Sequence, residues 1–255
     1  MEFFDSHAHY NDEKFESNRD ELIEKTYDEG VTNLICAGYD VKSSKEAIEI
    51  ANKYDFIHAI VGISPNDIEG IKEEDYNVIR SLAQDKKAVA IGEIGLDYYW
   101  NTDNKNEQKN AFIKQIEIAN ELDLPIVIHT REATLDTIDI LKNKAICKKT
   151  GIIHCCPLNQ ELIKEVLNLG FYISFAGPVT FKNSKNADTV ILQVPMERIL
   201  IETDSPYLSP EPVRGRTNDS RNVKFIAQKI ADVKGISIQE VAEKTYENAQ
   251  KIFNI

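Results

Sequence analysis

Short apolar runs rich in Val, Ile and Phe alternate with longer amphipathic segments along the whole chain. This alternation indicates repeated β–α units, in which each strand of a parallel sheet is followed by a helix that covers it. We expect eight strands, centred on Phe3–Phe4, Asn33–Cys36, His58–Val61, Val89–Ile91, Ile126–Ile128, Ile152–Ile153, Tyr172–Phe175 and Ile199–Ile201. Eight consecutive units favour an α/β fold in which the sheet closes into a single (β/α)8 barrel, a TIM barrel.

The amphipathic segments have helical periodicity. Between residues 107 and 122, Phe112, Ile116 and Ala119 recur at spacings of three and four, and a second such segment, 162–169, stops at Gly170. The last segment, 238–255, predicts an extra C-terminal helix that closes the underside or the flank of the barrel. An open doubly wound sheet is the structural alternative, but its usual G-x-G-x-x-G motif after the first strand is absent.

Composition limits the number of domains and the kind of partner. The 255 residues, 42% of them hydrophobic, suffice for one barrel-sized core, and no Pro/Gly/Ser-rich linker interrupts the alternation, so we predict one domain over residues 1–255. The 30 Lys and Arg against 42 Asp and Glu give a net charge of −12, which is atypical of a broad nucleic-acid-binding surface. An anionic substrate would therefore have to be attracted locally.

The N-terminal residues carry no basic region, no apolar stretch of signal-peptide length and no small-residue cleavage site. No later run is long enough to span a bilayer. We therefore expect a cytoplasmic protein without a membrane partner, and nothing in the sequence indicates its oligomeric state.

Four of the five histidines fall at the predicted C-terminal ends of strands. His7 and His9 follow the first strand, His129 ends the fifth and His154 follows the sixth, whereas His58 opens the third strand and is interpreted as structural. The C-terminal ends of barrel strands meet at one mouth, so residues far apart in sequence can share a site there. The histidine positions therefore predict a single site.

The spacing of His7 and His9 suits a metal ion. Residues two apart in extended backbone point to the same face, where two imidazoles can hold one cation, although two satisfied polar side chains would give the same pattern. Asp5, two residues earlier, either orients an imidazole from behind or is a structural carboxylate at the strand end.

Two carboxylates also follow apolar strands. Glu93 lies between Gly92 and Gly95, where an unpartnered carboxylate would be costly, and a position bridging two cations would remove that cost. Asp204 follows the eighth strand and precedes Pro206. Core strain at Glu93 and a helix N-cap at Asp204 are the structural alternatives, but beside four strand-end histidines a metal site is favoured.

The four cysteines, Cys36, Cys147, Cys155 and Cys156, form no C-x-x-C pair. We interpret them as buried thiols. Because Cys155 and Cys156 directly follow His154, a sulfur ligand to the metal is the alternative.

Taken together, these residues resemble the TatD family of metal-dependent hydrolases, within the amidohydrolase-like barrels. The resemblance covers essentially the whole chain and rests on the segments Asp5–His9, Gly92–Tyr98, Ile128–Arg131, His154–Cys155 and Glu202–Leu208, followed by Pro212, Arg214, Gly215 and Asn218. It implies a (β/α)8 barrel, a centre of two divalent cations, and phosphodiester hydrolysis of DNA, often from the 3′ end.

The resemblance also implies a division of the ligands. One cation would be held by His7, His9, Glu93 and Asp204, and the second by Glu93, His129 and His154. Many relatives have a histidine-rich segment after the third strand, whereas this chain has Ser64 and Asn66 there, so its substrate contacts are expected to differ from theirs.

Two such cations would activate a water and neutralise a phosphoryl oxygen, with Glu93 and Asp204 as the catalytic carboxylates and Asp204 as the candidate general base. The ligand types suit Zn²⁺, Mn²⁺ or Fe²⁺, with weaker binding of Mg²⁺. For substrate binding we predict Arg131 as a phosphate clamp and Arg214, at the start of a basic segment that extends to Lys234. The structural alternatives are an ion-pair partner for Arg131 and a solvated helix face for Lys224, Lys229 and Lys234. Tyr98, Tyr99 and Trp100 either stack on bases or pack.

The sequence leaves three functions open. The first is a deoxyribonuclease or phosphodiesterase, possibly a 3′–5′ exonuclease, whose partner is DNA or another phosphodiester. The second is an amide, lactone or phosphotriester hydrolase on the same two-cation centre. The third is a catalytically silent metal-binding module, which the presence of all six ligands disfavours.

Overall fold

The strands form one parallel sheet in sequence order, each pairing with the next from β1 to β8. The computed structural model describes all 255 residues. The strands are β1 (Phe3–Ala8), β2 (Val31–Ala37), β3 (Ile57–Val61), β4 (Ala88–Asp97), β5 (Ile126–Arg131), β6 (Ile152–Ile153), β7 (Tyr172–Phe175) and β8 (Ile199–Ile201). Backbone hydrogen bonds from Asp204 N to His7 O (2.9 Å) and from His9 N to Ser205 O (2.7 Å) join β1 to the segment after β8. The predicted TIM barrel and all eight strand positions are confirmed.

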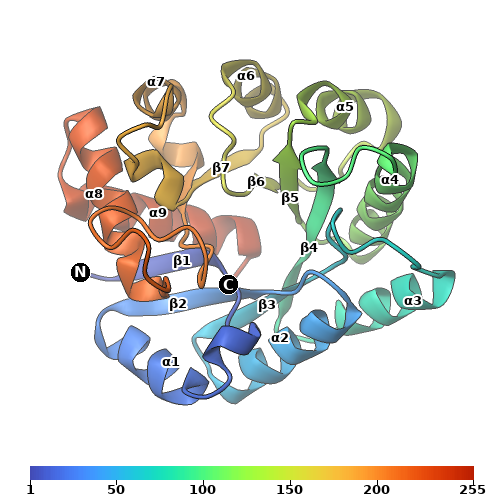
Figure 1. Cartoon of the computed structure of the whole chain (residues 1–255), viewed down its shortest axis with the longest axis horizontal. Coiled ribbons are helices and arrows are strands. Elements are labelled where there is room, and N and C mark those ends of the chain that lie inside the picture. Colours follow the sequence, from blue (N-terminus) through green and yellow to red (C-terminus); the bar gives the residue numbers. More distant parts are fainter.

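Helices surround this sheet (Figure 1). They are α1 (Arg19–Asp28), α2 (Val41–Lys53), α3 (Glu73–Leu82), α4 (Lys105–Leu122), α5 (Thr134–Asp139), α6 (Gln160–Asn168), α7 (Ala187–Gln193), α8 (Val223–Lys234) and α9 (Ile238–Phe253). The segments with the clearest helical periodicity, 107–122, 162–169 and 238–255, coincide with α4, α6 and α9 to within a few residues. No helix is both long and apolar enough to cross a membrane.

Successive strand residues point to opposite faces, which creates two apolar layers. The larger layer packs the outside of the strands against the helices. The smaller layer fills the barrel interior with residues such as Phe4, Ile35, Ile60 and Leu200. Because both faces of the parallel sheet are covered, the strands are rich in apolar residues, and the charged residues of β4 and the histidine of β5 lie toward their C-terminal ends.

The extra helix α9 closes the N-terminal end of the barrel. Its Phe253 is buried and stacks on Phe4 of β1 with ring centroids 6.1 Å apart, and Tyr246 meets the edge of the same Phe4 ring at 5.6 Å. The Asn248 side-chain amide donates to the carbonyl oxygens of Met196 (2.7 Å) and Ile199 (2.8 Å). The expected C-terminal helix is thus confirmed, and it leaves only the opposite mouth open.

We predict that Phe253→Ala lowers the free energy of unfolding by about 3–5 kcal/mol, the usual cost of truncating a buried aromatic side chain. Denaturant unfolding followed by circular dichroism measures this loss. Lys251→Ala, at an exposed position of the same helix, is the control and should change stability little. Equal effects of the two substitutions would contradict the role of Phe253 in closing the barrel.

Candidate metal centre

The open mouth of the barrel contains a cavity of about 940 Å³. Its walls come from the loops after the strands, and the predicted ligands His9, Glu93, His129, His154 and Asp204 all line it. His7 is completely buried behind them. The structure therefore brings all six predicted metal ligands together at the C-terminal ends of the strands.

Four donor atoms form a first group, provided by β1, β4 and the segment after β8. His7 Nε2 and His9 Nε2 are 3.3 Å apart. Glu93 Oε2 lies 3.4 Å from His7 Nε2 and 3.9 Å from His9 Nε2. Asp204 Oδ1 lies 3.9 Å and 3.3 Å from the same two nitrogens.

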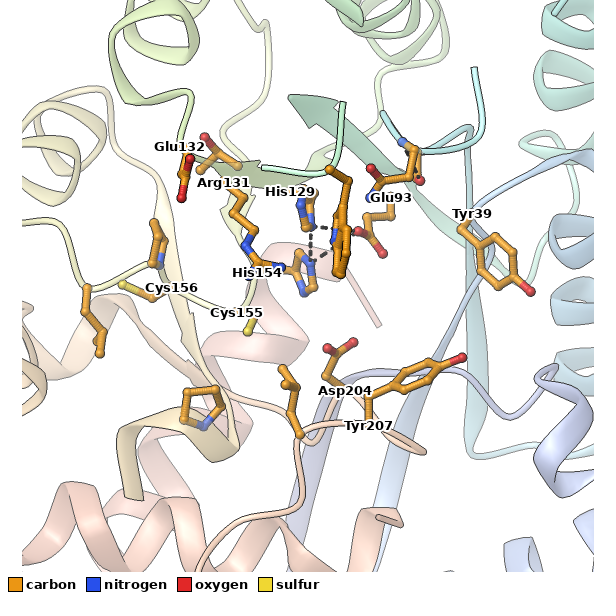
Figure 2. A pocket seen from close by; sticks show the side chains of 18 of the residues that line it. Tyr39, Glu93, His129, Arg131, Glu132, His154, Cys155, Cys156, Asp204 and Tyr207 are labelled. Carbon is orange, nitrogen blue, oxygen red and sulfur yellow. Dashed lines mark hydrogen bonds and ion pairs between the residues drawn. The ribbon is translucent and has the colours of Figure 1, made fainter. Parts of the chain in front are cut away.

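The other oxygen of Glu93 belongs to a second group. Glu93 Oε1 lies 3.0 Å from His129 Nδ1 and 3.4 Å from His154 Nε2, and these two nitrogens are 3.4 Å apart. Figure 2 shows the imidazoles of His129 and His154 meeting the Glu93 carboxylate. Glu93 therefore presents one oxygen to each group.

The spacing within both groups fits a bound divalent cation. Donors that each lie about 2.1 Å from one tetrahedral ion are about 3.4 Å from one another. The distances between donor atoms given above run from 3.0 to 3.9 Å. Imidazole nitrogens and carboxylate oxygens are the donors that such ions take from proteins, so each group can hold a metal.

The electrostatics of the centre also suit cations. Burial opposes ionisation of the Glu93 carboxyl, but His154 and His129 outweigh this effect and hold its pKa well below the usual range. Burial acts in the same sense on Asp204, and there His9 and His154 keep the pKa low. Neither carboxylate has a lysine or arginine partner. The negative charges of a buried Glu93 and a partly buried Asp204 are thus balanced only by imidazoles, which metal ions can replace as the source of positive charge.

Hydrogen bonds behind the ligands fix which ring nitrogen faces the centre. His9 Nδ1 donates to the carbonyl oxygen of Ala37 (3.0 Å). His154 Nδ1 donates to Glu202 Oε1 (3.1 Å), and His129 Nε2 donates to Asp97 Oδ2 (2.9 Å). Each acceptor can only accept, so the opposite nitrogen of each ring presents its lone pair to the cation site.

Glu202 and Asp97 are functional residues that the sequence reasoning did not identify. Both are completely buried. Both lie in the motifs after β8 and in β4 that suggested the family, and each is an acidic residue at an apolar strand end. Glu202 Oε2 and His7 Nδ1 are buried and have no hydrogen-bond partner.

Asp5 contacts the backbone of His7 rather than its imidazole. Its carboxylate accepts from His7 N (3.3 Å), Thr203 N (2.9 Å) and Thr203 Oγ1 (2.5 Å), and burial raises its pKa to about 7. Asp5 is therefore a structural carboxylate, the second of the two roles expected from the sequence. It links β1 by hydrogen bonds to the segment that carries Asp204.

Gly95 is required by the close approach of β4 and β5. It has a φ of +138°, and a Cβ atom there would lie 2.0 Å from the carbonyl oxygen of His129. Only glycine allows this approach, which places Glu93 beside His129. The glycine two residues after Glu93 thus has a direct structural purpose.

The structure separates the predicted substrate-binding arginines. Arg131 lines the cavity, and its guanidinium lies 3.6 Å above the Tyr99 ring (Figure 2 labels Arg131). Arg214 is not among the lining residues; it lies 4.0 Å from the centre of the Phe181 ring and 3.9 Å from Glu211. Its part in substrate binding stays a prediction.

Most of the basic segment after Arg214 is engaged in other contacts. Arg221 pairs with Asp219 and Glu29, and Lys229 pairs with Asp188. Lys224 lies 3.9 Å from Glu29, and Lys234 donates to the carbonyl oxygen of Val194. None of these three lysines lines the cavity, and all lie at exposed or partly exposed positions of α8, as the alternative of a solvated helix face expects.

The remaining predicted residues lie at or away from the cavity. Cys155 and Cys156 line it, but neither belongs to a donor group that can hold a metal. Ser64 donates to Asp67 (2.6 Å) and Asn66 donates to Asp97 (3.4 Å). His58 is at the start of β3, at the opposite end of the barrel from the centre.

Comparisons with known proteins identify the family of the chain. The family model described as TatD related DNase matches residues 4–254. The chain is 42% identical over 252 residues to the metal-dependent hydrolase YabD of Bacillus subtilis, and the match covers 99% of both chains. It is 34% identical over 259 residues to the metal-dependent hydrolase YcfH of Escherichia coli K12, with 100% of this chain and 97% of the relative covered.

A solved structure shows the same fold. The TatD homologue YjjV of Escherichia coli K12 superimposes with a TM-score of 0.93 over 99% of this chain and 98% of its own, at 22% sequence identity. The family match over nearly the whole chain, the close relatives and the barrel together show that this protein belongs to the TatD family of metal-dependent hydrolases.

Proposed function

We propose that the protein is a phosphodiesterase, most simply a deoxyribonuclease acting at a 3′ end, that uses two divalent cations. The observation that carries the proposal is the position of Glu93, whose two carboxylate oxygens belong to separate donor groups. Glu93 would thus contribute one oxygen to each of two cations, and such a pair would supply the charge stabilisation that assists in-line phosphoryl displacement. The description of the matching family as related to a DNase supports the choice of substrate.

When bound, the cations would supply an acidified water and charge neutralisation at a phosphoryl oxygen. The protein residues provide position and proton transfer. Asp204 has its Oδ1 in the first donor group and lines the cavity, so we assign it as the general base that takes a proton from the attacking water. Glu93 fixes the spacing of the two groups.

Arg131 is the best candidate for binding the substrate phosphate. Its guanidinium forms no ion pair or hydrogen bond with another residue and is held in place by stacking on Tyr99. Its donors are therefore free for a planar, two-oxygen contact with a phosphate. One local cation of this kind also accounts for how a chain of net charge −12 can attract an anion.

One observation favours a second substrate class, the amides, lactones or phosphotriesters. Where many relatives carry imidazoles after β3, Ser64 and Asn66 engage Asp67 and Asp97, and so neither adds a positive charge to the cavity. Turnover tests with single-stranded DNA, a generic phosphodiester, a phosphotriester and a lactone distinguish the two classes. Hydrolysis of the neutral substrates alone would contradict the phosphodiesterase proposal.

We predict that Zn²⁺ binds more tightly as the pH rises from about 6 to about 8, with release of protons. Burial lowers the pKa of His129 in the metal-free protein, but Asp97 and Glu93 outweigh burial and raise it to about 9. Below that pH a proton competes with the cation for the nitrogen. Titration calorimetry in buffers of different ionisation enthalpy counts the protons released.

His58→Gln is the control for this pH dependence. Burial and Lys87 lower the pKa of His58 to about 4, so it is neutral across the range tested. The number of protons released should be unchanged. Zn²⁺ affinity that is independent of pH in the wild-type protein would contradict the assignment of the imidazoles as ligands.

We predict that Asp204→Asn reduces kcat by at least about 100-fold on every substrate that the protein hydrolyses, because the general base is removed whichever bond is cleaved. The fold should be retained. Asp188→Asn makes the same change in an exposed ion pair on α7 and should leave kcat unchanged. Steady-state kinetics measure both, and a small effect of Asp204→Asn would show that another group accepts the proton.

We predict that Arg131→Ala raises KM for an anionic phosphodiester and has less effect on a neutral ester or lactone, because a phosphate clamp contributes only where there is charge to bind. Arg131→Lys keeps the charge without the planar fork and should fall between the wild type and Arg131→Ala. An equal loss on charged and neutral substrates would instead show that Arg131 supports the loop that carries Tyr99.

A further inference from the structure

Asp97, at the end of β4, has two carboxylate oxygens that serve different parts of the site. Oδ1 accepts from the backbone amides of Tyr99 (2.9 Å) and Trp100 (3.2 Å). Oδ2 accepts from His129 Nε2 (2.9 Å) and from the Asn66 amide (3.4 Å). A single buried side chain therefore joins a cavity loop to a metal ligand.

The loop that Asp97 holds carries Tyr99 and Trp100, which together with Arg131 at the end of β5 form a cluster that we call the aromatic wall. Trp100 and Arg131 line the cavity. The Tyr99 and Trp100 rings meet edge to face at 4.8 Å, and the Arg131 guanidinium lies 3.6 Å from Tyr99 and 5.5 Å from Trp100. The exposed fractions of Tyr99 and Trp100 are 49% and 69%. With so little packing, their position depends on the backbone bonds to Asp97 and on the stacked arginine.

The other oxygen of Asp97 fixes the protonation of His129. Since a carboxylate accepts, Nε2 must carry the proton, and Nδ1 then presents its lone pair beside Glu93. Carboxylates behind metal-binding histidines act in this way on ring orientation and basicity.

Asp97 itself is held rigidly by Gln108 of α4. The Gln108 side chain accepts from Asp97 N (2.8 Å) and donates to Asp97 O (2.9 Å), and it also reaches the carbonyl oxygen of Asn101 (3.3 Å). Gln108 is completely buried. A change at one carboxylate oxygen is therefore passed to the other rather than absorbed by movement of the backbone.

We infer that Asp97 is a positioning residue that couples cation binding at His129 to the position of the aromatic wall. The inference rests on the proposed two-cation centre. Binding of the cation on the His129 side orients the imidazole, the imidazole orients Asp97, and Asp97 sets the loop that carries Trp100. Such coupling is reciprocal: if cation binding favours one position of the aromatic wall by a given factor, that position of the wall raises the affinity for the cation by the same factor.

Trp100 is the only tryptophan of the chain, so its fluorescence reports on the wall without a label. The experiment titrates the metal-free, full-length protein with Zn²⁺ and records calorimetry and tryptophan emission in parallel. In the wild-type protein, we expect two Zn²⁺ ions to bind and a saturable change of emission to follow the ion that occupies the His129 side.

Asp97→Asn removes the coupling without changing the size of the side chain. An asparagine has one oxygen, so it can accept from the Tyr99 and Trp100 amides or from His129, but not from both. We expect affinity for one Zn²⁺ to fall by about 10–100-fold, the usual effect of losing such a partner. At saturating Zn²⁺ the emission change should be lost, and circular dichroism should show an intact fold.

Asp67→Asn is the matched control. Asp67 is another carboxylate of the same cavity, but it accepts from Ser64 and contacts neither His129 nor the wall. Its Zn²⁺ affinity and emission response should stay close to those of the wild type. Equal losses in Asp67→Asn and Asp97→Asn would mean that charge alone is responsible, which would overturn the inference.

The other possible results of the Zn²⁺ titrations also test the inference. Two bound Zn²⁺ ions with unchanged emission in the wild-type protein would overturn the coupling alone, and this measurement does not depend on whether Asp97→Asn folds. An Asp97→Asn protein with the wild-type emission change would show that the signal travels by another route. A wild-type protein that binds only one Zn²⁺ would overturn the two-cation centre and this inference with it.

Discussion

The burial of Glu93 and Asp204 among four imidazoles is the constraint on which the rest of the site depends. Two carboxylates with so little access to water are tolerated only where positive charge compensates them. The chain supplies no lysine or arginine for this purpose. The imidazoles can provide the positive charge only when they are protonated, and burial opposes their protonation. A bound metal ion would compensate the carboxylates without charging an imidazole, and the donor groups have the composition and spacing that such an ion needs.

The two ends of the barrel have different roles: the N-terminal end stabilises the fold, and the C-terminal end holds the candidate metal centre. Its N-terminal end is filled by apolar side chains and closed by α9, whose Phe253 stacks on Phe4. The C-terminal end can therefore hold polar groups whose burial weakens the fold. This division is usual for the fold, because the loops after the strands vary without disturbing the core.

Sequence patterns located the strands and the six ligands but not the contacts that orient them. Strand positions follow from apolar runs, and strand-end histidines follow from topology. The roles of Asp97 and Glu202 depend on which way a buried carboxylate turns, and periodicity carries no such information. The same holds for the arginines: Arg131 and Arg214 look alike in sequence, yet only Arg131 lines the cavity, because Arg214 lies against Phe181.

The candidate metal ligands also take part in closing the barrel. Asp204 N donates to His7 O and His9 N donates to Ser205 O, so the backbone that joins β1 to the segment after β8 belongs to the ligands themselves or their immediate neighbour. Asp5 adds a buried link between the same segments through Thr203. A cation held by His7, His9 and Asp204 would therefore cross-link the first and last strands through side chains, where backbone bonds already join them. Binding of a cation there would stabilise the fold where the first and last strands meet, and the positions of His7, His9 and Asp204 follow from barrel closure rather than from a separate loop.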